Sequence, residues 1–126
     1  MAYDHGAFRV KNLKDSIQFY TEKLGFKFLF QHDNQTHGEK YALLKYNGAR
    51  LELIETVGRT YTPTMPEHPF CPHLCFRTDD IDGVLETLNK NNIAIIDGPN
   101  EIPGKEKWFY FTDPDYNVLE CIIWYE

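Results

Sequence analysis

The sequence predicts an α+β fold made of two tandem βαβββ modules. Strand and helix patterns occur in the same order twice along the 126 residues, on either side of a proline-rich stretch. The chain also aligns with itself at a shift of 68 positions. A chain of this length can bury a core without disulfides. We therefore expect one domain over residues 1–126, with module one at 1–57, a linker at 58–70 and module two at 71–126.

The first module begins with an alternating, β-prone segment over residues 3–10. A helix is expected next, because Asn12 can cap its first turn and Gly25 can end it where a left-handed residue is needed. Asn47-Gly48 is a strong signal for a two-residue hairpin. The three strands expected after the helix are 26–32, 39–46 and 49–56.

Three histidines of the chain are expected to be solvated loop residues. His32 and His37 lie in the polar stretch 31–38, whose composition is typical of a connection between two strands. His68 lies in the proline-rich linker. We therefore do not expect these histidines to bind a ligand.

The second module repeats this order. Asp79-Asp80 is expected to cap a helix that carries apolar residues at helical spacing from Ile81 onward. Residues 98–104 contain two glycines and two prolines, so they are expected to form a loop. The strands expected in this module are 72–78, 93–97, 107–112 and 117–125.

The shift of 68 aligns polar as well as apolar residues of the two modules. Matched apolar residues alone would indicate only that the two modules share a pattern of buried positions. Matched histidines and glutamates suggest in addition that a site is duplicated. The aligned pairs are His5 with His73, Arg9 with Arg77, Leu13 with Ile81, Ile17 with Leu85, Tyr41 with Phe109 and Glu52 with Glu120.

Composition excludes several classes of protein. The chain has 13 Lys and Arg against 19 Asp and Glu, a net charge of −6, and no basic cluster, which argues against a nucleic-acid partner. It has no apolar run long enough to cross a membrane and no export signal at its start, so we expect a cytoplasmic protein. Cys71, Cys75 and Cys121 lack the spacing of a disulfide framework and are expected to be buried reduced thiols.

The duplicated His and Glu residues form a candidate metal-ligand set. Imidazole nitrogens suit Ni, Co and Zn, and two carboxylates would cancel the charge of a divalent ion. Glu52 and Glu120 lie among aliphatic residues, where a carboxylate is costly unless it is paired or bound to a metal. The alternative is that His5 and His73 are structural residues and that the two glutamates lie on a solvated face of a sheet.

Five segments resemble the vicinal-oxygen-chelate superfamily, which includes glyoxalases, bleomycin-resistance proteins and dioxygenases. They are 4–10 (DHGAFRV), 16–26 (SIQFYTEKLGF), 51–53 (LEL), 72–74 (PHL) and 113–120 (DPDYNVLE). The resemblance covers nearly the whole chain. Within the superfamily, the His/Glu/His/Glu set is similar to the short bacterial form of glyoxalase I, lactoylglutathione lyase.

This resemblance implies an open, barrel-like sheet around one divalent metal ion (Ni, Co or Zn), usually in a homodimer that shares its sites between chains. His5 and Glu52 of one chain would then meet His73 and Glu120 of the other. The implied reaction converts the hemithioacetal of methylglyoxal and glutathione to the lactoyl thioester through an enediolate. Glu120 would move the proton, Glu52 would be its partner ligand, and Arg9 would hold a carboxylate of glutathione.

Two departures from the glyoxalase pattern leave the thiol open between glutathione and another low-molecular-weight thiol. Thr56-Val57-Gly58 stands in place of Asn-Trp-Gly, and Pro72 stands in place of Gly before the second His. Other members of the superfamily remain alternatives: an acyl-CoA epimerase, a fosfomycin-type thiol transferase, or a metal-free resistance protein that binds a small molecule. An aromatic cleft would support the last of these, formed by Phe8, Tyr41, Trp108 and Phe111.

Overall fold

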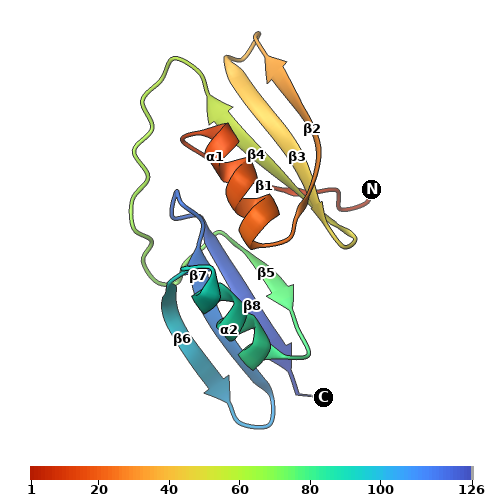
Figure 1. Cartoon of the computed structure of the whole chain (residues 1–126), viewed down its shortest axis with the longest axis vertical. Helices are drawn as coiled ribbons and strands as arrows, with labels where there is room; N and C mark the ends of the chain where they lie inside the picture. Colours follow the sequence, from red (N-terminus) through yellow and green to blue (C-terminus); the bar gives the residue numbers. More distant parts are fainter. Residues whose placement is uncertain (126) are drawn as a thin grey trace. The chain divides into compact units, whose positions relative to one another are not determined.

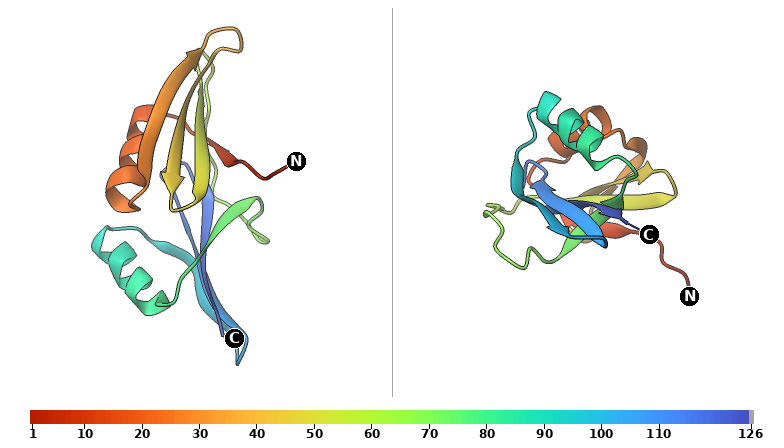
Figure 2. Two further views of the ribbon diagram at one scale, coloured as in Figure 1. Left: turned by 90° about the vertical axis from the view of Figure 1, so that its right-hand side faces the viewer. Right: turned by 90° about the horizontal axis from the view of Figure 1, so that it is seen from below.

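A computed structural model describes residues 1–125 of the chain. The chain divides into two compact units, Met1–Thr64 and a second unit that begins at Met65. Each unit has the order βαβββ and forms one open, four-stranded mixed sheet with its helix on one face (Figures 1 and 2). The α+β prediction is therefore confirmed. The division between the units falls inside the segment expected to be a linker.

The first unit contains a sheet with the order β1-β4-β3-β2, in which β1 is parallel to β4 and the other pairs are antiparallel. Its elements are β1 (Gly6–Arg9), α1 (Leu13–Gln18), the π-helical segment η1 (Phe19–Lys23), β2 (Lys27–Asn34), β3 (Glu39–Tyr46) and β4 (Ala49–Thr56). Tyr20, Leu13, Leu51 and Leu53 are almost fully buried. The side chains of Leu51 and Leu53 lie on the core side of β4. Because Glu52 lies between them in the strand, its side chain lies on the other face of the sheet.

Two side chains secure the start of α1. The Asn12 side chain accepts a hydrogen bond from the Asp15 amide at 3.0 Å, which confirms Asn12 as the cap. Glu55 of β4 accepts a hydrogen bond from the Leu13 amide at 2.6 Å, and its other oxygen lies 3.6 Å from Lys40 Nζ. Glu55 thus ties the first turn of the helix to the centre of the sheet.

The second unit contains a sheet with the order β5-β8-β7-β6, again with one parallel pair, β5 with β8. Its elements are β5 (His73–Arg77), α2 (Ile81–Lys90), β6 (Ile95–Ile102), β7 (Glu106–Thr112) and β8 (Val118–Trp124). The Asp80 side chain accepts a hydrogen bond from the Gly83 amide at 3.0 Å and caps α2 as expected. Each helix therefore begins at an equivalent position of its module.

A buried aspartate sets the turn before β8. Asp113, only 3% exposed, accepts hydrogen bonds from the backbone amides of Asp115 and Asn117 and from the Asn117 side chain, each at 2.9 Å. These bonds fix where β8 begins, and hence the position of Glu120 along the strand.

The duplication is preserved in the strand register. Ala7 lies opposite Glu52 in the first sheet, and Cys75 lies opposite Glu120 in the second, so the shift of 68 holds for both strands. It fails for β7. Ile54 and Ile122 are equivalent positions at the shift of 68. Ile54 pairs with Tyr41, and Ile122 pairs with Trp108. Trp108 is therefore the structural counterpart of Tyr41, and the predicted match of Tyr41 to Phe109 is wrong. A one-residue change of register reverses the face, and Phe109 is accordingly buried in the core.

Several expected boundaries need correction. The first strand begins at Gly6, not at residue 3, and the stretch expected as a loop at 98–104 is largely part of β6. Register shifts between β6 and β7 at Asp97, together with a positive φ at Gly98, let the strand continue through this region. His32 lies within β2 and not in a loop. The strands expected at 39–46 and 49–56 are confirmed as β3 and β4.

None of the helices in the described part of the chain is long and apolar enough to cross a membrane.

Candidate functional site

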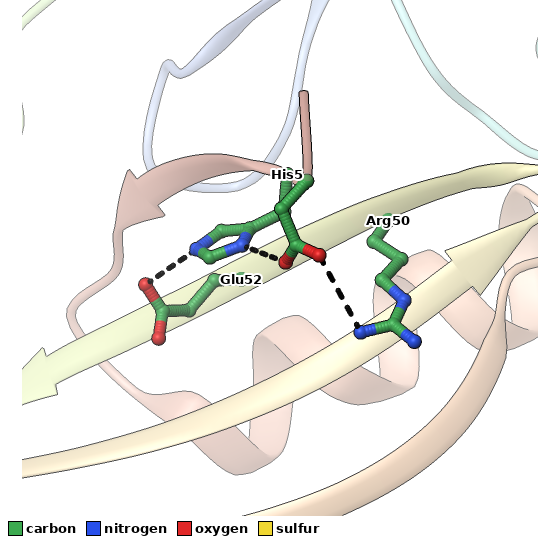
Figure 3. A network of polar contacts seen from close by, with 4 residues as sticks. His5, Arg50 and Glu52 are labelled. Carbon is green, nitrogen blue, oxygen red and sulfur yellow. Dashed lines mark hydrogen bonds and ion pairs between the residues drawn. The ribbon is translucent and has the colours of Figure 1, made fainter. Parts of the chain in front are cut away.

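The first unit brings His5 next to Glu52. His5 immediately precedes β1, and the parallel pairing of β1 with β4 places Ala7 opposite Glu52. The Nε2 atom of His5 lies 3.5 Å from Oε1 of Glu52 (Figure 3). Both side chains are partly exposed, on the sheet face that does not carry α1. The two residues predicted as ligands in module one therefore form a pair.

Asp4 holds the His5 ring in place. Its carboxylate lies 2.7 Å from Nδ1 of His5 and 4.0 Å from the guanidinium of Arg50. The hydrogen bond from His5 lowers the pKa of Asp4, and the same bond, opposed by desolvation and helped by the negative charge of Glu52, raises the pKa of His5. Since an ionised carboxylate can only accept, Nδ1 must carry a proton and Nε2 faces Glu52.

The second unit contains an equivalent pair, His73 and Glu120. Nε2 of His73 lies 3.1 Å from Oε1 of Glu120, and the two side chains are 22% and 12% exposed. Nδ1 of His73 donates to the backbone carbonyl of Phe70 at 2.9 Å. A carbonyl, like a carboxylate, only accepts, so this ring also directs Nε2 at its glutamate.

Both pairs show the arrangement expected of metal ligands. A neutral imidazole that donates through Nδ1 presents a lone pair at Nε2, which a carboxylate repels unless a proton or a metal cation lies between them. Ligating histidines usually donate their other ring nitrogen to a carboxylate or a backbone carbonyl, as His5 and His73 do. Two neighbouring ligands at about 2.1 Å from one metal lie roughly 3 Å apart, close to the two observed N···O distances.

Each unit supplies two of these four donors. Within residues 1–125 the structure contains no group of three or more His, Cys, Asp or Glu side chains placed to hold a metal. The structure brings together His5 with Glu52 in the first unit and His73 with Glu120 in the second. We call these two His–Glu pairs the half-sites, because their four residues are the predicted ligands.

Two further side chains lie beside Glu120 that the sequence did not single out. Tyr110 pairs with Glu120 across β7 and β8, and its ring lies 5.5 Å from that of His73. Desolvation, followed by the negative charge of Glu120, raises the pKa of Tyr110. Cys75 lies opposite Glu120 on β5. The sequence could have indicated this position of Cys75, because it lies two residues after His73 and alternate residues of a strand share a face.

Arg9, predicted to bind substrate, lies on the same strand face as His5. Its guanidinium donates to the Thr56 hydroxyl at 2.9 Å and stacks over the Tyr61 ring at 4.2 Å. A polar cavity of about 470 Å³ adjoins Thr56. It is lined by Val10, Lys11, Glu55, Thr56 and residues 58–62. Arg9 is therefore fixed at the end of β4, next to a cavity of the first unit.

Other expectations about side chains are corrected. Only Cys121 is a buried thiol, while Cys71 and Cys75 are exposed and all three are free. Phe8 and Phe111 are 7% and 4% exposed and belong to the cores, so they cannot line the aromatic cleft expected of a metal-free binding protein.

His68 is exposed as expected, but it has a partner. Its Nε2 atom lies 2.9 Å from the Asp97 carboxylate, which also accepts from the Asn100 amide at 2.6 Å. The hydrogen bond from Asn100, followed by that of His68, lowers the pKa of Asp97. This pair ties the segment before β5 to β6.

Comparisons with known proteins agree with this fold. The family model of the Glyoxalase/Bleomycin resistance protein/Dioxygenase superfamily matches residues 2–121. The chain is 27% identical to a probable lactoylglutathione lyase of Vibrio cholerae, over 94% of this chain and 87% of that protein. It is 29% identical to the metallothiol transferase FosB of Lysinibacillus sphaericus, over 93% of this chain and 78% of that protein.

A solved structure, that of a glyoxalase family protein from Enterococcus faecalis, superposes with a TM-score of 0.78 at 28% identity. The match covers 96% of both chains. This chain therefore belongs to the Glyoxalase/Bleomycin resistance protein/Dioxygenase superfamily, the vicinal-oxygen-chelate proteins. Members similar to it include enzymes named for thiol substrates.

Proposed function

We propose that this protein is a metal-dependent lyase of the glyoxalase I kind, which isomerises the hemithioacetal of methylglyoxal and a low-molecular-weight thiol. The observation that carries the proposal is the repeated half-site. In both units a histidine is held through Nδ1 and directs Nε2 at a glutamate. If these residues only lay on a solvated face of the sheet, neither histidine ring would need a hydrogen bond at Nδ1 that directs Nε2 at a glutamate.

The donor set of His5, Glu52, His73 and Glu120 suits a divalent cation. Two imidazoles and two carboxylates are accepted by Ni, Co and Zn, and the carboxylates neutralise the charge of the ion. Four protein donors would leave coordination positions for water or substrate on a six-coordinate ion, as a catalytic site requires. We propose one cation for each complete set of donors.

We propose that a homodimer completes the site. His5 and Glu52 of one chain would meet His73 and Glu120 of its partner, in the manner implied by the resemblance to short glyoxalases. Each unit carries two of the four donors.

The chain's own residues have distinct roles in this proposal. When bound, the cation supplies Lewis-acid stabilisation for the negative charge that develops on the substrate oxygens in the enediolate. Glu120 takes the proton from the carbon next to the carbonyl and returns it to the adjacent carbon. Glu52 remains a ligand, and Arg9 holds a carboxylate of the thiol. The hydrogen bond from Arg9 to Thr56 supports this placement, because it fixes the guanidinium beside a polar cavity.

A fosfomycin-type thiol transferase is the second candidate. The similarity to the metallothiol transferase FosB favours it, since that identity is as high as the identity to the lactoylglutathione lyase. The position of Glu52 beside His5 favours the lyase, because the transferases do not need a carboxylate on this strand. An acyl-CoA epimerase remains a further alternative.

A metal-by-substrate assay tests the proposal. The protein is stripped of metal, reconstituted separately with nickel, cobalt and zinc, and analysed for bound metal. Thioester formation is then followed from methylglyoxal with glutathione and with other low-molecular-weight thiols. We expect about one divalent ion per chain and activity with at least one thiol. An empty site after all three reconstitutions would reject the metal-dependent reading.

Two variants separate the site from the rest of the protein. Glu120→Gln keeps the shape of the side chain but cannot accept the proton, so kcat should fall by about 10²–10⁴-fold. His68→Gln is a matched control, because His68 also contacts a carboxylate, that of Asp97, outside the half-sites. Its metal content and activity should equal those of the unmodified protein. Thiol transfer to fosfomycin without thioester formation would assign the second candidate instead.

A further inference from the structure

The two half-sites differ in the residue that the parallel edge strand places opposite the glutamate, and in the second half-site this residue lies next to the proposed base. Ala7 is the residue opposite Glu52 on the parallel neighbouring strand, and Cys75 is the residue opposite Glu120. Residues opposite each other in paired strands project from the same face of the sheet, with neighbouring side chains. Glu120 therefore has a polar neighbour on its edge strand that Glu52 lacks.

Cys75 also shares a face with His73, two residues earlier on β5. The His73 ring approaches Oε1 of Glu120 at 3.1 Å from the same strand. β5 thus presents both a ring nitrogen and a thiol to one carboxylate.

The thiol can only serve that carboxylate as a hydrogen-bond donor. A free thiol is protonated at neutral pH, whereas a carboxylate is ionised. The side chains of Cys75 and Glu120 are hydrogen-bonded to each other. Cys75 is a free cysteine, so its S–H group is available to donate.

We propose that Cys75 is a positioning residue for Glu120: its thiol donates a hydrogen bond to the carboxylate and keeps it aligned with His73. This inference rests on the proposed function for its catalytic consequence. Glu52 needs no such partner, because in that function it remains a ligand throughout. Glu120 must change partners during proton transfer. A neutral donor on the adjacent strand holds the Glu120 carboxylate in place, whereas a cationic donor would compete with the other partners of that carboxylate.

The hydrogen bond itself is tested without turnover. The infrared S–H stretching band of Cys75 is obtained as the difference between the unmodified protein and Cys75→Ser. We expect a band shifted to low frequency by a strong acceptor, and Glu120→Gln should move it back toward that of a weakly bonded thiol. Cys71→Ser is the matched control, because Cys71 is an exposed thiol whose sulfur contacts the Pro69 carbonyl at 3.6 Å. An S–H band of Cys75 that ignores Glu120→Gln overturns the proposal, whether or not the protein proves to be a glyoxalase.

Kinetics and a metal spectrum then separate positioning from other roles. Cys75→Ala should lower kcat by about 2–10-fold with KM unchanged, the amount expected for loss of one hydrogen bond. Cys75→Ser retains a donor and should restore kcat to within about twofold. In the cobalt-loaded protein, a thiolate-to-cobalt absorption band that disappears in Cys75→Ser would make the sulfur a ligand and overturn the proposal.

Discussion

Replacing Asp4 by alanine tests whether His5 is a metal ligand. In the structure, the Asp4 carboxylate is 2.7 Å from Nδ1 of His5 and so sets the proton position and the orientation of the ring. If Nε2 binds a metal, removal of Asp4 frees the ring to rotate and lowers its basicity. Partners of this kind contribute about 10–100-fold to metal affinity.

The structure places the expected loss near the lower limit of that range. The Asp4 side chain is 67% exposed, so water screens its charge and can replace part of the hydrogen bond. We expect about a tenfold weaker affinity for zinc in Asp4→Ala and a smaller loss in Asp4→Asn, which keeps an acceptor oxygen. Arg50→Gln should change the affinity by less than about twofold, because its exposed contact with Asp4 is 4.0 Å long.

The assay is competition for zinc between metal-free protein and a chromophoric chelator, with circular dichroism to confirm folding of each variant. Asp97→Ala is the matched control, since it removes a carboxylate from a histidine at 2.9 Å outside the half-sites. If folded Asp4→Ala binds zinc as tightly as the unmodified protein, Asp4 does not orient His5 as a metal ligand. The same conclusion follows if Asp97→Ala loses as much zinc affinity as Asp4→Ala.

Two predictions concern stability. Glu55→Ala leaves the Leu13 amide at the start of α1 without its acceptor and should lower the free energy of unfolding by about 1.5–3 kcal/mol, measured by urea denaturation. The hydrogen bonds of Asn100 and His68 lower the pKa of Asp97 in the folded state. The ionised Asp97 carboxylate therefore stabilises the fold at pH values above its unfolded pKa near 3.8, and this stabilisation is lost as the pH falls and the carboxylate is protonated. The stability difference between the protein and Asp97→Asn should shrink as the pH falls below about 4. A difference that grows as the pH falls below that value would contradict it.

Local sequence signals were sufficient where an element depends on its near neighbours. The hairpin of β3 and β4 was predicted with its bounds because Asn47-Gly48 joins two alternating segments over a short stretch of chain. The caps Asn12 and Asp80 were predicted for the same reason, since each bonds a backbone amide three residues away.

Sequence reasoning failed where the outcome depended on pairing between strands. The stretch after Gly98 was expected to be a loop, but pairing with β7 through two register shifts makes most of it strand. The match of Tyr41 to Phe109 failed because the register of β7 on β8 differs by one residue from that of β3 on β4. Register is a tertiary property, and a change of one residue moves a side chain to the other face.

The candidate residues of the half-sites could be read from the amino-acid sequence alone, because periodicity and duplication identify His5, Glu52, His73 and Glu120 from near and repeated positions. How the members of each pair come together depends on the folded chain. Pairing of β1 with β4 brings His5 to Glu52, and pairing of β5 with β8 brings Cys75 opposite Glu120, which is 45 positions further along the chain. These contacts depend on hydrogen bonding between strands distant in sequence, which no local pattern encodes.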